Sequence, residues 1–278
     1  MPQESYYPIN EYYRARIQEM RLLDDDFMRV VFDQNPEATE TVLQIIMDKQ
    51  DLKVQSVQAQ CEVKNIYGRS VRLDVYATDT AGKRYDIEIQ RDDEGASERR
   101  ARYNQSIMDT NHLPAGSDPK TLPETYVIFF TEHDVRGGGL PIYHIERVIV
   151  ETGEWFDDGE HIIYVNGAYP KEDTPLGALI ADFRESDPDR MRYEPLAKRM
   201  RYLKKSEEGV GRMCRIMEEI VKKERLEERR EAKHEEFLRL IRKLWSKPSS
   251  LAEMVWFSER TEEEVIAALH ELGLSVPN

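Results

Sequence analysis

The sequence predicts an α/β protein, with a mixed central sheet flanked by helices and then a charged α-helical C-terminal extension. Three observations lead to this prediction. Residues 54–63 and 71–91 alternate between apolar and polar side chains, as strands do. The stretch TYVIFF at 125–130 is an unbroken apolar run, which is typical of a central strand covered on both faces. Charged sequence of helical periodicity follows residue 190.

Two helices and a strand are expected before residue 64. In LLDDDFMRVVF, Asp24 to Asp26 can cap a helix and favour its positive end. A second helix is expected from Glu37, with apolar residues at three- and four-residue spacings. The segment 54–63 follows as a first strand, because small or apolar residues alternate there with glutamine and glutamate.

The stretch VRLDVYATDTAGKRYDIEIQR, residues 71–91, reads as a β-hairpin. Its turn pairs Asp79 with Lys83 through a three-residue loop, closed by Gly82 in the left-handed conformation. Counting back from this turn sets Asp74 directly opposite Glu88, with their Cβ atoms about 5 Å apart. Both strands are expected to be half-buried, with these acids and Gln90 on the polar face.

Two carboxylates at this separation need compensation, because at an effective dielectric near 20 they repel by roughly 3 kcal/mol. A divalent cation would provide it, and oxygen ligands of this type suit Mg²⁺ or Mn²⁺, which can activate water against a phosphodiester. The alternative needs no metal. Acidic residues are common on the wet face of hairpins, and Arg72, Arg84 or Arg91 could neutralise the pair.

The elements after the hairpin complete the expected sheet. A helix is predicted from Ser97 to about Asn111, then the central strand at 125–130 and further strands within 140–150 and 161–167. A short helix ends before Pro188, which gives a boundary near residue 190. The predicted domains are therefore a sheet domain at 1–190, a charged helical extension at 191–247 and a small helical segment at 248–278.

Charge is distributed unevenly along the chain. The net formal charge of −14 argues against a cationic coat for nucleic acid, although residues 196–247 hold 17 Lys and Arg against 10 Glu. A salt-bridged surface helix and a phosphate-contacting one both fit that segment. The last segment resembles a helix-turn-helix whose second helix is capped by Thr261 and Glu264, but it is acidic, which favours packing or partner contact. A homo-oligomer formed through the C-terminal helices is a further prediction.

Other function classes receive no support from the sequence. No apolar run reaches the roughly 18 residues of a membrane span, and the start lacks the regions of a signal peptide, so no membrane partner and a cytoplasmic location are expected. The two cysteines and six histidines are scattered, without the spacing of a zinc site or a local Ser/His/Asp triad.

The order of elements and the acidic hairpin together resemble the PD-(D/E)XK nuclease fold, in its transposase-like, recombination-promoting branch. The resemblance extends over about residues 20–220. It rests on successive phrases: DDDFMRVVF, GRSVRLDVYATDTAGKRYDIEIQR, ERRARYNQSIMDTN, LPETYVIFFTEHDV, GLPIYHIERV, HIIYVNGAY and RYLKKSEEGVGRMCRIMEE. It implies a restriction-endonuclease-like sheet and a metal-dependent DNA endonuclease associated with mobile elements or recombination.

The resemblance also implies roles for the hairpin residues. Asp74 is the first acid of the motif and a metal ligand, Glu88 is the second ligand, and the backbone carbonyl of Ile89 is the third. Gln90 stands where the motif has lysine. Its neutral amide can orient water but brings no positive charge, so that charge has to come from elsewhere.

Nearby residues are candidates for auxiliary roles. Arg99, Arg102 or Lys64 could supply the missing charge. Tyr103, one helical turn after Arg99, is a candidate DNA contact, with helix–sheet packing as the alternative. Glu62 is a candidate auxiliary acid, or an ordinary surface glutamate.

Two other functions stay open at this point. One is a non-catalytic module that keeps the fold for binding nucleic acid or protein, which the missing lysine favours. The other is RNA cleavage, because the metal chemistry does not by itself distinguish the two sugars.

Overall fold

The computed structural model describes residues 11–277, apart from 65–67, 69, 92 and 248. The chain divides into two compact units, residues 1–213 and 214–278. The domain boundaries expected near residues 190 and 247 stay a prediction. Among the described residues, no helix combines the length and the apolar character that crossing a membrane requires.

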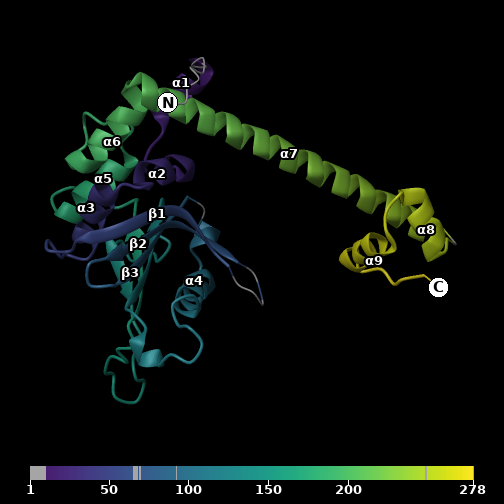
Figure 1. Cartoon of the computed structure of the whole chain (residues 1–278), viewed down its shortest axis with the longest axis horizontal. Coiled ribbons are helices and arrows are strands. Elements are labelled where there is room, and N and C mark those ends of the chain that lie inside the picture. The colour runs from purple at the N-terminus through teal and green to yellow at the C-terminus, as the bar shows by residue number, and fades with distance from the viewer. Residues whose placement is uncertain (1–10, 65–67, 69, 92, 248, 278) are drawn as a thin grey trace. The chain divides into compact units, whose positions relative to one another are not determined.

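The first unit is built around a six-stranded sheet (Figure 1). The strand order is β1-β2-β3-β4-β6-β5, with β3, β4 and β6 parallel and the other neighbours antiparallel. The predicted mixed sheet is therefore confirmed. The strands are β1 (Val54–Val63), β2 (Val71–Asp79), β3 (Arg84–Gln90), β4 (Thr125–Thr131), β5 (Ile142–Ile145) and β6 (Glu160–Asn166).

Helices cover both faces of this sheet, and α4 lies on the opposite side from α2 and α3 (Figure 1). The helices are α1 (Glu11–Glu19), α2 (Asp25–Phe32), α3 (Pro36–Ile46), α4 (Glu98–Thr110), α5 (Pro175–Arg184) and α6 (Glu194–Lys205), with the short 3-10 helices η1 (Asp93–Ala96) and η2 (Pro119–Thr121). The helix α1 was not expected from the sequence.

The strand β4 shows why its sequence is apolar throughout. Phe130 stacks on Phe183 of α5 with ring centroids 4.0 Å apart, whereas the adjacent Phe129 stacks on Tyr164 of β6 at 5.4 Å. Successive side chains of a strand point to opposite faces, so both faces of β4 are packed. Every residue of β4 is buried, which confirms the predicted central strand.

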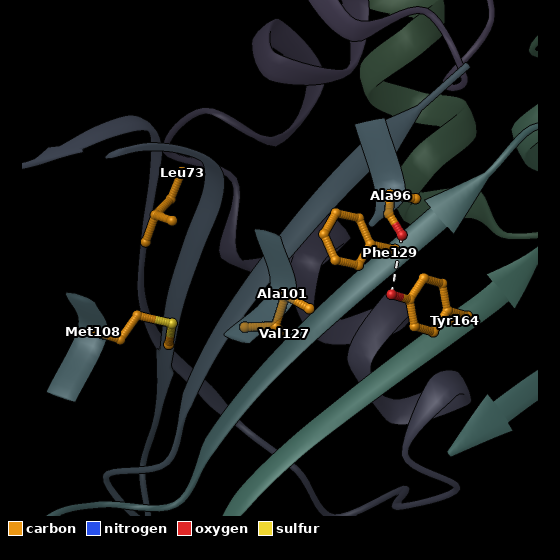
Figure 2. Packing of buried hydrophobic residues seen from close by; sticks show 7 residues of the cluster. All are labelled: Leu73, Ala96, Ala101, Met108, Val127, Phe129 and Tyr164. Atoms are coloured by element: carbon orange, nitrogen blue, oxygen red, sulfur yellow. Dashed lines mark hydrogen bonds between the residues drawn. The ribbon is translucent and has the colours of Figure 1, made fainter. Parts of the chain in front are cut away.

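The α4 side of the sheet holds its own apolar cluster, shown in Figure 2. Ala101 and Met108 of α4 pack there against Val127 and Phe129, and the hydroxyl of Tyr164 donates a hydrogen bond to the carbonyl of Ala96 at 3.0 Å (Figure 2). These contacts fix the start of α4 against the middle of the sheet.

The β2–β3 turn has the predicted form. Gly82 adopts φ +84°, and the backbone N–H of Asp79 donates to the carbonyl of Lys83 at 3.0 Å. Only glycine adopts such a φ without cost, so Gly82 sets the loop length. The observed pairing runs from Thr78 with Arg84 to Val75 with Ile87, which is the register expected from the turn and ends one step before Asp74 and Glu88.

The prediction that both strands of this hairpin are half-buried is wrong. Because α4 covers the face expected to be wet, Asp86 and Glu88 are fully buried and Asp74 is only 3% exposed. The alternation also breaks at Asp74, since Leu73 and Tyr76 both pack into the cluster on the α4 side. The neighbouring strand is irregular at the same level, where Gln60 adopts φ +53° between the pairs Ala59–Val75 and Cys61–Leu73.

The second unit is helical and has a small core. It contains most of α7 (Glu207–Trp245), then α8 (Leu251–Ser258) and α9 (Glu262–Glu271). Ser250 with Glu253, and Thr261 with Glu264, form capping boxes at the starts of α8 and α9, as expected for Thr261. The core consists of Ile241, Met254, Val265, Ala268 and Leu269.

Candidate functional site

A cavity of about 1240 Å³ lies beside the ends of β2 and β3, between α2 and α4. Asp74, Ile89 and Gln90 of the predicted site line it. Among the described residues, six arginines also line it: Arg29, Arg72, Arg91, Arg99, Arg100 and Arg102. In a chain with a net charge of −14, this is a local concentration of positive charge around two strands that carry acids.

Asp74 is held from the α2 side. Its Oδ1 accepts hydrogen bonds from Arg29, at 2.8 Å from Nη2 and 3.3 Å from Nε. The same guanidinium also forms ion pairs with Asp25 at 2.6 Å and with Asp26 at 3.6 Å. Asp25 was expected only to cap α2, and the structure places it on the cavity wall.

Glu88 is held from the α4 side. It lies on this face because its parallel neighbour in β4 is Phe129, which packs beneath α4. Arg100 forms an ion pair with Glu88 Oε2, and Asn104 Nδ2 lies 3.3 Å from Oε1. The backbone N–H of Asp74 also donates to the Glu88 carboxylate, which places the two predicted acids next to each other.

The buried acids disfavour one another's ionisation. Burial, and then the charges of Asp86 and Asp74, raise the pKa of Glu88 well above its ordinary value. Burial likewise raises the pKa of Asp86. On the cavity wall, burial and the charge of Asp74 raise the pKa of Asp25 to about 6. The positive charges of Arg29 and Arg100 are therefore too few to keep all the carboxyl groups of the site ionised.

Gln90 points toward Glu88, with Nε2 3.5 Å from Oε2. Its amide occupies space that glycine leaves open, because a Cβ added at Gly95 would lie 1.9 Å from Gln90 Oε1 and 3.0 Å from its Cδ. Any larger residue at position 95 would have to displace the amide. Gly95 thus belongs to the site although it carries no functional group.

Of the other predicted site residues, four line the cavity and one does not. Arg99, Arg102, Tyr103 and Glu62 line the same cavity as Asp74. Lys64 is exposed and, within the described residues, is not among those that line it.

The arginines offered as alternative counter-charges are engaged elsewhere or exposed. Arg84 donates to the hydroxyl oxygen of Tyr76 at 2.9 Å, and Arg91 bonds Glu132 and Asp24. Arg72 lines the cavity from an exposed position. In the described part of the chain, the ion pairs to Asp74 and Glu88 come from Arg29 and Arg100 instead.

Sequence reasoning missed Arg29, Arg100, Asn104 and Gly95. A signal existed for two of them: Arg100 and Asn104 are four residues apart in a helix that was expected from Ser97, so they share one face. Arg29 lies 45 residues before Asp74, and no local pattern relates them.

The oxygen donors of the site fit a hard divalent cation. Asp74, Glu88 and the carbonyl of Ile89 are the ligand types that Mg²⁺ and Mn²⁺ take, with water completing the shell. Buried Oδ1 atoms of Asp86, Asn104 and Asp25 have no hydrogen-bond partner, so the site has unsatisfied oxygens. Over the described residues, no three His, Cys, Asp or Glu side chains converge as metal ligands, whereas this set needs only two carboxylates.

Residues 28–169 match the PD-(D/E)XK nuclease family transposase, a span that contains the second half of α2, the hairpin and α4. No curated protein and no solved structure matches the chain significantly. The mixed sheet with helices on both faces agrees with the restriction-endonuclease-like fold, and both hairpin acids lie within the matched span. The chain belongs to the PD-(D/E)XK nuclease family transposases, a nuclease family linked to mobile elements.

Proposed function

We propose that this protein is a metal-dependent DNA endonuclease that hydrolyses phosphodiester bonds. The observation that carries the proposal is that the buried carboxylate of Glu88 lies next to buried Asp74, and that Asp74 lines a cavity together with six arginines of the described residues. Acids that share a buried site suit a cation, and arginines around them suit phosphates. Membership of a nuclease family supports the same chemistry.

Asp74, Glu88 and the carbonyl of Ile89 would hold Mg²⁺ or Mn²⁺. When bound, the cation lowers the pKa of a coordinated water and stabilises the charge that develops on the phosphate. Gln90, whose amide reaches Glu88, orients the attacking water by hydrogen bonding. Arg29 keeps Asp74 in place from the opposite side of the site.

The arginines specify a polyanionic substrate. Arg99 and Arg102 lie on the first two turns of α4, where they border the cavity with Tyr103. Guanidinium groups bind phosphate oxygens in a forked geometry and position a nucleic-acid backbone without reading its sequence. We propose DNA as the substrate because of the family's link to mobile elements. RNA cleavage is an outcome of the test below.

One observation favours a second function, a non-catalytic nuclease fold that binds nucleic acid or protein. Gln90 stands in the position of the motif's lysine, and Arg29 and Arg100 already neutralise Asp74 and Glu88. A protein of this kind would bind DNA through its arginines and leave it intact, with or without a divalent cation.

The test is cleavage of supercoiled plasmid, with labelled single-stranded DNA and RNA alongside, in Mg²⁺, Mn²⁺ or EDTA. Asp74→Asn is compared with Asp79→Asn, which changes a buried acid of the same strand at the turn, outside the cavity. We expect metal-dependent nicking that Asp74→Asn abolishes and Asp79→Asn retains. Folded wild-type protein that shifts DNA in a gel but never cuts it would support the binding module instead.

A further inference from the structure

We propose that Arg100 supplies the fixed positive charge that Gln90, in the lysine position of the motif, does not bring to the site. The inference rests on the proposed nuclease function and deepens it. Arg100 was not among the candidates that the sequence offered for this charge, which were Arg99, Arg102 and Lys64. The contacts of its guanidinium distinguish it from them.

Arg100 and Gln90 converge on one oxygen atom. The Nη2 of Arg100 forms its ion pair with Oε2 of Glu88, and the Nε2 of Gln90 points to the same Oε2. Both side chains also border Gly95. Arg100 Nη1 donates to the Gly95 carbonyl at 3.0 Å, and a Cβ at Gly95 would be 3.6 Å from Nη1 and 1.9 Å from Gln90 Oε1. A guanidinium therefore lies beside the amide.

The position of Arg100 is built into the fold. It lies in the first turn of α4, where its backbone N–H donates to the Ser97 cap, and the next residue, Ala101, is buried in the cluster of Figure 2. Its guanidinium lies 5.9 Å from the ring centroid of Phe129, the β4 neighbour of Glu88. A charge fixed in advance costs no reorganisation when the transition state forms.

The other arginine bonded to the acids is less suited to this role. Arg29 is shared among Asp74, Asp25 and Asp26, so three carboxylates offset its charge. Arg100 pairs with Glu88, and 35% of its side chain is exposed toward solvent, whereas Glu88 is fully buried. The guanidinium thus reaches from the buried acid to the cavity that it lines.

A contrary role for Arg100 is that of a plug, which occupies Glu88 and must leave before a cation binds. The two roles predict opposite effects when the charge is removed. Loss of a transition-state charge lowers kcat and leaves binding nearly unchanged, whereas loss of a plug raises the affinity for Mg²⁺ and the rate with it.

The experiment measures Mg²⁺-dependent nicking rates at varied DNA and Mg²⁺ concentrations for Arg100→Met, Arg100→Lys, Gln90→Lys and the double variant Gln90→Lys/Arg100→Met. Arg136→Met is the matched control. Arg136 also packs over an aromatic ring, at 5.5 Å from the centroid of Tyr164, pairs with Glu98 of α4 and is 34% exposed, but it does not line the cavity.

We expect Arg100→Met to lower kcat about 100-fold with little change in KM, the size of effect seen when one charge-stabilising donor is removed. Arg100→Lys should retain most of the activity because it keeps the charge. In the double variant, Gln90→Lys should restore most of what Arg100→Met loses, because lysine then returns to its place in the motif. Arg136→Met should cut as wild type does.

Four results would overturn the inference. An Arg100→Met variant that cuts as fast as wild type shows that the charge has no role in cleavage, and one that cuts faster with tighter Mg²⁺ binding identifies a plug. A double variant as slow as Arg100→Met shows that a charge at position 90 does not replace Arg100. If Arg100→Met does not fold, the comparison is made between Arg100→Gln and Arg100→Lys. Equal activity of these two variants would show that cleavage does not need a positive charge at this position. Folded wild-type protein without any activity overturns the nuclease proposal itself, and this inference with it.

Discussion

Asp86 and Glu88 share the amide of a single side chain, Asn104, whose Nδ2 lies 2.9 Å from Asp86 Oδ2 and 3.3 Å from Glu88 Oε1. All three residues are fully buried, so no bulk water takes over these bonds. The helix α4 is therefore attached to the sheet at a polar point as well as through its apolar cluster.

Replacement of Asn104 by leucine should destabilise the protein more than the same replacement of an ordinary buried amide side chain. Asn104→Leu removes the donor from two buried acids, and we expect a loss of about 3 kcal/mol in urea unfolding. Gln105→Leu is the control, because Gln105 is buried on the same helix and donates to one neutral carbonyl, that of His161, at 3.0 Å. A loss of about 1 kcal/mol is expected there. Equal losses in the two variants would show that sharing the amide between two acids adds nothing to the stability.

A methyl group at position 95 should impair cleavage without unfolding the protein. Gly95→Ala places a carbon where the Gln90 amide lies, and the end of that flexible side chain can move away. We expect a fall in nicking rate of about tenfold, within the range found when one positioned group is lost, and a change in stability below about 1 kcal/mol. Gly211→Ala, with no atom within 4 Å of the added carbon, is the control. An unchanged rate would mean that the placement of Gln90 is immaterial.

Divalent cations should stabilise the folded protein through Asp74. At a Mg²⁺ concentration ten times its Kd, binding adds about 1.4 kcal/mol, which raises Tm by roughly 3–6 °C for a protein of this size. Asp74→Asn should remove this rise, whereas Asp79→Asn should keep it. Thermal unfolding with and without Mg²⁺ measures both. A rise that survives Asp74→Asn would place the cation elsewhere.

Stability should fall in mild acid through His112. Burial and then the nearby Arg84 lower the pKa of this imidazole from 6.5 to about 4, and its Nε2 lies 2.6 Å from the hydroxyl of Tyr76. Since the folded protein disfavours the protonated ring, this contribution is fully present above pH 6.5 and is lost as pH falls toward 4.

Urea unfolding at pH 7.5 and pH 5 measures this contribution. His112→Gln, which keeps an acceptor for Tyr76 but does not titrate, should lose less stability on acidification than wild type. His144→Gln, at an exposed position of β5, should behave as wild type does. If His112→Gln and wild type respond to pH alike, the acid sensitivity comes from other groups.

The sequence was sufficient for the mixed sheet and for the hairpin turn, because both depend on local chemistry. Alternation gave β1 with its observed ends, and a glycine suited to positive φ at position 82 set the hairpin register. The error in burial has a physical reason. The buried face of α4 contains Asn104 and Gln105, so the hydrophobic pattern of this predicted helix did not indicate that it covers the acidic face of the hairpin.

The arginines that pair with the two acids could not be predicted from local sequence patterns. Arg29 reaches Asp74 across 45 residues, and only the packing of α2 on the sheet brings them together. Arg100 lies between the two candidates Arg99 and Arg102 on the same helix, and the rotation of α4 about its axis decides which of the three faces Glu88. That rotation depends on Ala101 and Met108 in the apolar cluster, a tertiary contact.

The order of elements has a consequence for protein synthesis. Every residue that lines the cavity precedes residue 107, yet β3 is held in the middle of the sheet by β4, and β4 by β6, which ends at Asn166. A ribosome therefore completes all the side chains of the site some sixty codons before it completes β6, the last of the strands that support them. A message cut short within that interval would encode the acids and arginines of a nuclease without the scaffold that brings them together.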